Sequence, residues 1–126
     1  MNWLTRIIDT MLGRVSTVSE QLVVNEEFSA WLNATRIMNG RDAIGIELEM
    51  IEVSIENNRL QLRKGLGHHW LGNCKRQNSG QGFLNIKQAA EKWMGSHYHK
   101  DALLDPTIKY IGVAFGMGEY WTFSAR

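Results

Sequence analysis

Residues 89–121 constrain the fold of this chain most tightly. They read A-A-E-K-W-M-G-S-H-Y-H-K-D-A-L-L-D-P and continue with two short apolar runs, I-G-V-A-F and E-Y-W. The first part predicts a helix that carries Trp93 and runs into a tight turn over residues 96–99. The apolar runs, joined by a glycine-rich turn, predict a β-hairpin. His99 is therefore expected at the mouth of a helix-to-strand connection, where functional side chains are common.

Composition limits the classes of function. The 126 residues are enough for one domain with its own core. A net charge of +1, with Lys and Arg scattered along the chain, gives no electrostatic case for a nucleic-acid partner. A single cysteine, Cys74, excludes an internal disulfide and fits a reducing compartment. No apolar run suggests a membrane span or a signal peptide, so a cytoplasmic or virion location is expected.

The N-terminal residues predict an amphipathic helix. Apolar residues recur at helical spacing over residues 3–22, and such a stripe needs covering. This apolar stripe packs either against the chain's own domain or against a protein partner, which includes a second copy in a homo-oligomer. Asn25 is a good N-cap and Gly40 a good stop for a second helix. We therefore expect residues 1–24 to be an appendage to a domain formed by residues 25–126.

The centre of the chain is ambiguous. Over residues 44–64, alternating apolar residues on both sides of the pair Asn57 and Asn58 predict a β-hairpin. Apolar residues from Leu48 onward also lie on one helical stripe, so the residues alone leave both alternatives open. Residues 65–82 are rich in Gly and Asn and predict an ordered loop.

Few residues can carry chemistry. The candidate metal ligands are histidines in two pairs about 30 residues apart, His68 with His69 and His97 with His99. Two neutral imidazoles, completed by a carboxylate or water, would suit Zn²⁺ or a similar divalent ion, but surface or capping roles explain the same pairs. Cys74 and Ser96 lack the base, helix terminus or oxyanion motif that an activated nucleophile requires.

Several of these motifs resemble one known family. The segment W93-M-G-S-H-Y-H99, followed by A-L-L-D-P, I-G-V-A-F and Y-W-T, is similar to the C-terminal signature of the CAP superfamily. That superfamily contains the cysteine-rich secretory, antigen 5 and pathogenesis-related proteins, and its bacterial and phage branch is the most similar. N33-A-T-R36, L66-G-H68 and R76-Q-N78 resemble the family's upstream motifs in the same order, so the resemblance covers about residues 25–126.

The resemblance implies an α+β fold and a site. The fold is a three-layer α–β–α sandwich with a small, mainly antiparallel sheet, and residues 44–64 are then a helix. His68 and His99 are expected to face one cleft and to be the metal ligands, if a divalent metal such as Zn²⁺ is held. The remaining expected cleft residues are Gln77, Asn78, Ser96 and His69.

The departures from the family pattern favour binding over catalysis. The family's conserved Glu before Asn is Gln77 here, which removes a charged ligand and a general base. We therefore expect a non-catalytic binding or structural module, in its most specific version a phage virion or assembly component. The alternative is a metal-dependent hydrolase or protease that uses the two-histidine cleft. Binding of a small apolar ligand would require a groove.

Overall fold

The computed structural model describes residues 18–116 and 118–126. The predicted helix over residues 3–22 falls largely on residues 1–17, which lie outside the described residues. The described elements, in chain order, are α2 (Val18–Met38), β1 (Gly45–Ile46), α3 (Leu48–Lys64), β2 (Arg76–Gln81), α4 (Ile86–Met94), α5 (His97–Leu103), β3 (Tyr110–Gly116) and β4 (Tyr120–Ala125). No helix in these ranges is long and apolar enough to cross a bilayer.

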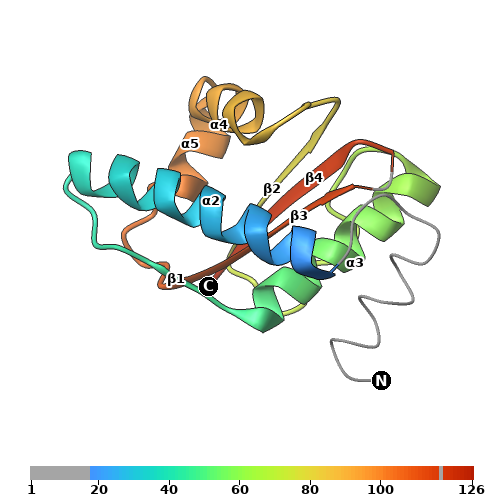
Figure 1. The fold of residues 1–126 in the computed structure, drawn as a ribbon, viewed down its shortest axis with the longest axis horizontal. Helices are drawn as coiled ribbons and strands as arrows, with labels where there is room; N and C mark the ends of the chain where they lie inside the picture. Colours follow the sequence, from blue (N-terminus) through green and yellow to red (C-terminus); the bar gives the residue numbers. More distant parts are fainter. Residues whose placement is uncertain (1–17, 117) are drawn as a thin grey trace.

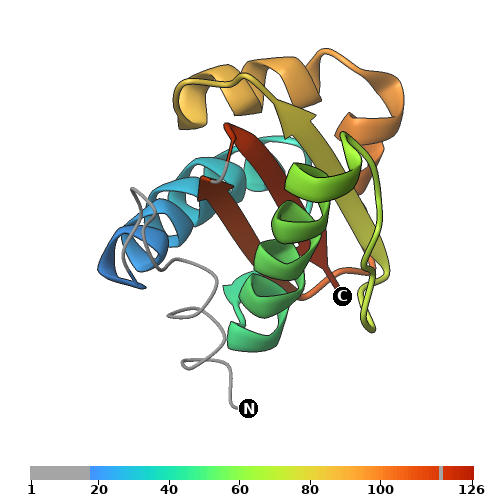
Figure 2. The same cartoon turned by 90° about the vertical axis from the view of Figure 1, so that its right-hand side faces the viewer.

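The elements form the expected three-layer sandwich. The sheet has the strand order β1-β3-β4-β2, with β1 parallel to β3 and the other neighbours antiparallel. Helices α2, α4 and α5 cover one face, and α3 covers the other (Figure 1, Figure 2). The α+β fold class and the C-terminal hairpin are therefore confirmed.

The face under α2 and α4 is apolar. Alternate residues of β4, Trp121 and Phe123, are buried there beside Phe28 of α2 and Trp93 of α4. The ring centroid of Phe123 lies 5.9 Å from that of Phe28 and 6.3 Å from that of Trp93. Aromatic rings at such separations bury large areas and favour tilted arrangements. This cluster is the core of the domain.

The layer under α3 contains many buried polar groups, and residues 48–64 form a helix rather than a hairpin. Beside apolar residues such as Met50 and Ile51, the helix buries polar residues, namely Ser54, Asn57, Asn58 and Gln61. The Asn58 amide nitrogen donates to the carbonyl oxygens of Ala114 (3.0 Å) and Tyr120 (3.1 Å). The backbone of α3 also lies directly against β3, because a Cβ atom on Gly112 would collide with Met50 and Ile51. The hairpin alternative rested on the pair Asn57 and Asn58, whose side chains bond to the sheet in the structure.

Asn25 does not cap a helix. Helix α2 runs without a break through residues 18–38, so Asn25 lies within it and is fully buried. Its amide nitrogen donates to the carbonyl oxygen of Val113 and its amide oxygen accepts from the Val113 backbone N–H, both at 2.8 Å. The prediction of Asn25 as an N-cap is therefore wrong, and its side chain instead bonds α2 to β3. The division of the chain at residues 24 and 25 remains a prediction.

Two further segments differ from the sequence-based expectation. Residues 76–81, expected in a loop, form strand β2, which pairs with β4 along its full length. Residues 97–103, expected to begin as a tight turn, form the short helix α5 with Ser96 as its N-cap residue. Strand β2 has no apolar alternation because it lies at the edge of the sheet, where pairing with β4 rather than burial holds it.

Candidate functional site

A polar cleft lies at the β2 edge of the sheet. Its volume is about 270 Å³. The residues that line it are His68, Lys75, Arg76, Gln77, Asn78, Tyr98, His99 and Ala102. The structure thus brings together four of the residues expected at the site, His68, Gln77, Asn78 and His99. Ser96 and His69 are not among the lining residues.

Gln77 holds the side chain of His68. The amide oxygen of Gln77 lies 2.8 Å from Nδ1 of His68. The amide nitrogen donates to the carbonyl oxygen of Trp70 at 2.9 Å and to the hydroxyl of Ser124 at 3.2 Å. Strand β2 therefore presents Gln77 between the loop that carries His68 and the neighbouring strand β4.

Asn57 holds the backbone on both sides of His68. From within α3, its amide oxygen accepts the backbone N–H groups of His69 (2.7 Å) and Trp70 (3.1 Å). Its amide nitrogen donates to the carbonyl oxygen of Gly67 at 3.0 Å. Sequence reasoning missed this role because the residue pattern left residues 44–64 open between a helix and a hairpin with Asn57 at its turn. The only available signal was the helical alternative for residues 44–64.

The neighbouring histidine, His69, is used differently. Its Nε2 atom lies 2.7 Å from the carbonyl oxygen of Gly65, the residue that ends α3. The ring is therefore engaged with the helix terminus, while the exposed ring of His68 lines the cleft. This distinguishes two adjacent histidines that the sequence could not separate.

His99 enters the cleft from α5, on the other side of β2. The Asn78 amide nitrogen donates to the His99 carbonyl oxygen at 3.0 Å, which ties α5 to β2. Buried Arg36 donates to the carbonyl oxygen of Leu103 at 2.9 Å and so fixes the far end of α5. The ring of His99 is partly buried, and this burial lowers the pKa of His99 below its usual value. The nearby charge of His68 lowers this pKa further. The lowered pKa favours the neutral imidazole of His99.

The donor set fits a tightly held Zn²⁺ poorly. Within residues 18–116 and 118–126, no three His, Cys, Asp or Glu side chains are grouped as metal ligands. His68 and His99 would be the only imidazole ligands from the cleft lining, and the Gln77 amide oxygen is already engaged with His68. Lys75 and Arg76 add positive charge to the same lining. Protein zinc sites usually supply three or four ligands, often anionic ones.

Cys74 lies close to the cleft but is a weak nucleophile. The thiol is partly buried, and this burial raises its pKa, against the effect of a hydrogen bond with Ser124. A raised pKa reduces the reactive thiolate fraction at neutral pH. The raised pKa of the Cys74 thiol therefore gives no support for cysteine chemistry at this position.

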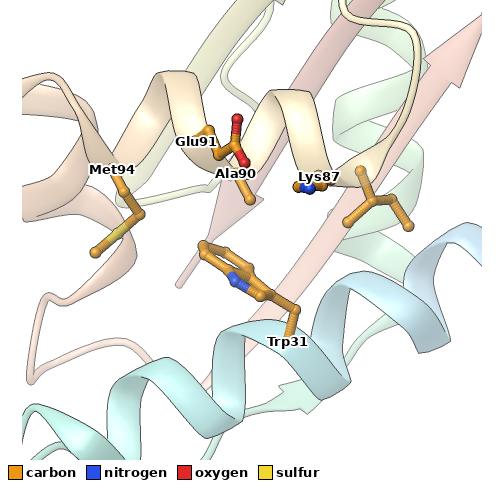
Figure 3. A pocket seen from close by; sticks show the side chains of 6 residues that line it. Trp31, Lys87, Ala90, Glu91 and Met94 are labelled. Carbon is orange, nitrogen blue, oxygen red and sulfur yellow. The ribbon is translucent and has the colours of Figure 1, made fainter.

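A second hollow lies between α2 and α4. Its volume is about 430 Å³. The lining residues are Trp31, Ile86, Lys87, Ala90, Glu91 and Met94. Figure 3 shows the indole of Trp31 rising from α2 toward Ala90 and Met94 on α4. This apolar groove is the feature that small apolar ligand binding required and that the sequence could not show.

Comparison with known proteins places the fold. No protein-family model matches the sequence, and no curated protein matches it. A cysteine-rich secretory protein from Staphylococcus aureus subsp. aureus Mu50 is similar in structure, with a TM-score of 0.65, 20% identity, and 86% of this chain and 40% of that chain covered. An extracellular protein containing a SCP domain from Bacillus anthracis str. Ames has a TM-score of 0.72 and 13% identity, with 87% of this chain and 43% of that chain covered. An outer surface protein from Borrelia burgdorferi has a TM-score of 0.73 and 15% identity, with 90% of this chain and 96% of that chain covered.

These likenesses confirm the resemblance at the level of the fold. The chain has the fold of CAP (SCP) domains, as its C-terminal motifs indicated. It spans less than half the length of the first two structures, at 40% and 43%. The likeness therefore establishes a CAP-type fold, and the activity of the chain has to be argued from its own residues.

Proposed function

We propose that this CAP-type domain is a non-catalytic binding module. The observation that carries the proposal is the amide at position 77, which bonds at once to His68, Trp70 and Ser124. No carboxylate is among the described residues that line the cleft. An amide cannot gain or lose a proton near neutral pH, so it cannot act as a general acid or base.

The groove between α2 and α4 is the proposed surface for an apolar ligand. Its volume of about 430 Å³ lies in the range of small-molecule sites, which are mostly apolar with a few polar groups at the rim. Trp31, Ile86 and Met94 supply apolar wall, and Lys87 and Glu91 supply one charge of each sign. An acyl chain whose anionic head lies beside Lys87 and away from Glu91 matches this arrangement.

Calorimetric titration with dodecanoate tests the apolar site. We expect binding that quenches Trp31 fluorescence and that an Ala90→Leu change weakens at least tenfold, because the new side chain fills the groove. The control is Ala34→Leu on the exposed side of α2, which leaves binding unchanged. Equal affinity for both variants would contradict the groove as the binding surface.

A metal-dependent hydrolase is the second candidate. The observation that favours it is that His68 and His99 line one cleft and that the pKa of His99 is lowered, which favours a neutral imidazole. Metal analysis of natively purified protein separates the two candidates. One Zn²⁺ per chain, lost together with hydrolysis in a His68→Ala/His99→Ala variant, would support the hydrolase and refute the binding module.

Assembly through the N-terminal residues is the most specific version of the proposal. Apolar residues recur over residues 3–15, so we propose that they join the chain to a protein partner or a second copy, as in a phage particle. Size exclusion with light scattering tests this: an oligomer should dissociate in an Ile8→Asp/Met11→Asp variant. A monomer under all conditions would contradict self-assembly. Because two similar structures are described as extracellular and outer surface proteins, location needs its own test by cell fractionation.

A further inference from the structure

The orientation of the Gln77 amide is determined by its surroundings. One of its terminal atoms lies 2.9 Å from the carbonyl oxygen of Trp70. A carbonyl oxygen can only accept, so this terminal atom is the nitrogen. The same nitrogen donates to the Ser124 hydroxyl at 3.2 Å. The remaining amide atom, which faces His68, is therefore the oxygen.

This orientation determines which nitrogen of His68 carries the proton. The Gln77 oxygen lies 2.8 Å from Nδ1 of His68, and two acceptors would repel at that distance. The Nδ1 atom must therefore donate. The Ser79 hydroxyl, 3.4 Å from Nδ1, does not change this conclusion because it donates its own proton to the Gly67 carbonyl at 2.8 Å. In the neutral ring the lone pair is then on Nε2.

We infer that Gln77 is a positioning residue which fixes this tautomer so that the cleft presents Nε2 of His68 as a hydrogen-bond acceptor. Nε2 has no partner among the described residues, and the exposed ring lines the cleft. A ligand at this position brings a hydroxyl or amide N–H. Lys75 and Arg76 line the same cleft and disfavour cations, so the donor belongs to an uncharged or anionic molecule.

The site is adapted to an amide at position 77. A carboxylate there would place one oxygen against the Trp70 carbonyl, where the nitrogen of Gln77 now donates. Gln77 is therefore a functional residue of this cleft, and its role is more than the absence of the carboxylate that the family has at this position.

Long-range ¹H–¹⁵N correlation spectra of the ligand-free protein test the inference. We expect the His68 ring, assigned with a His68→Asn variant, to show a protonated Nδ1 and an unprotonated Nε2 at pH 7.5. Free histidine side chains favour the opposite tautomer. Gln77→Ala should allow that tautomer to appear. A Ser124→Ala control should keep the wild-type pattern, because the Trp70 carbonyl still orients the amide.

Two outcomes of these spectra overturn the inference. One is a protonated Nε2 in the wild type. The other is an unchanged His68 pattern in a folded Gln77→Ala protein, since a merely structural role predicts only lower stability. Dispersed backbone spectra of each variant establish that it is folded.

A ligand pair then tests the chemical class. Glycolate carries a hydroxyl beside its charge, whereas acetate, the matched control, lacks it. We expect glycolate to shift the His68 Nε2 resonance at least three times as far as acetate at equal concentration. Equal shifts, or none, overturn the assignment of the ligand. Both readouts are independent of dodecanoate binding in the groove, so the failure of either proposal can be distinguished.

Discussion

The two faces of the sheet are built from different interactions, although the same strand supplies both. In β4, Phe123 points into the aromatic cluster under α2 and α4, whereas Thr122 and Ser124 point toward α3. The first face is packed mainly by apolar contact, although the Asn25 amide also bonds to Val113 there. The second combines buried apolar residues of α3 with many hydrogen bonds, such as the 3.1 Å bond from the Gln61 amide nitrogen to the Thr122 hydroxyl. The two faces of the sheet are thus held to their helices by different kinds of interaction.

The difference shows which face sets stability and which sets position. Apolar burial is strong but non-directional. Hydrogen bonds between buried groups contribute little net free energy, yet they fix orientation because leaving one unmade is costly. The polar face is also the one that holds the His68 loop through Asn57 and Gln77. We therefore expect losses on the apolar face to affect stability and losses on the polar face to affect the cleft.

The largest effect is expected on the apolar face. Phe123→Ala should lower the free energy of unfolding by about 3–5 kcal/mol, because it removes a fully buried ring from contact with Phe28 and Trp93. Urea unfolding measures the change. Tyr98→Ala, at a side chain that is 84% exposed, is the control and should cost less than about 0.5 kcal/mol. Similar losses in both variants would refute the aromatic cluster as the main source of stability.

Removal of Asn57 is expected to have the next largest effect. Asn57→Ala leaves the backbone N–H groups of His69 and Trp70 without their acceptor, at a cost of about 2–3 kcal/mol. Hydrogen exchange in residues 67–70 should accelerate at the same time. Asn58→Ala is the matched control, because Asn58 bonds only within the layer between α3 and the hairpin. Faster loop exchange in both variants would contradict a specific role for Asn57.

A smaller loss is expected for Ser54. Its hydroxyl donates to the Gly112 carbonyl at 2.8 Å and lies 2.9 Å from the Ser124 hydroxyl. Ser54→Ala should lower the free energy of unfolding by about 1 kcal/mol, as measured by thermal denaturation. Ser29→Ala on α2, which removes only a 3.5 Å contact with Asn33, should be close to neutral. A loss above about 3 kcal/mol for Ser54 would give the polar face the larger share of stability.

The smallest effect is the pH dependence from His99. Its pKa is lowered in the folded state, so the unfolded chain binds the proton more tightly. Stability from this group is complete above the unfolded value of 6.5 and decreases as the pH falls toward the folded pKa. We expect His99→Gln to reduce the loss of stability between pH 7.5 and pH 5.5. An unaltered slope in His99→Gln would contradict the burial of this ring as its cause.

The apolar face could largely be predicted from the sequence. The alternation in residues 108–123 predicts the hairpin, and helical spacing places Ala89, Ala90 and Trp93 inward, as observed. Both signals depend on apolar residues that must leave water wherever the chain places them. The polar face could not be predicted, because Ser54, Asn57 and Asn58 are buried against the expectation for their types. The polar strand β2 was hidden because an edge strand held by pairing with β4 needs no apolar alternation.

The candidate site divides in the same way. The resemblance of the motifs selected His68, Gln77, Asn78 and His99, which the structure brings to one cleft. It could not select between His68 and His69, nor show that Trp70 offers a carbonyl oxygen to the Gln77 nitrogen. These depend on the path of a loop whose residues carry no periodic signal.

The sequence by itself determined the apolar half of this protein, namely the C-terminal hairpin and the helix that carries Trp93. Hydrophobic spacing encodes such elements locally, because the period of the apolar residues is the period of the buried face. Only the tertiary structure decided that Asn25 and Asn57 bond to distant backbone and that Gln77 orients His68. A hydrogen bond needs a partner at a defined distance and angle, and for these side chains that partner comes from another part of the chain.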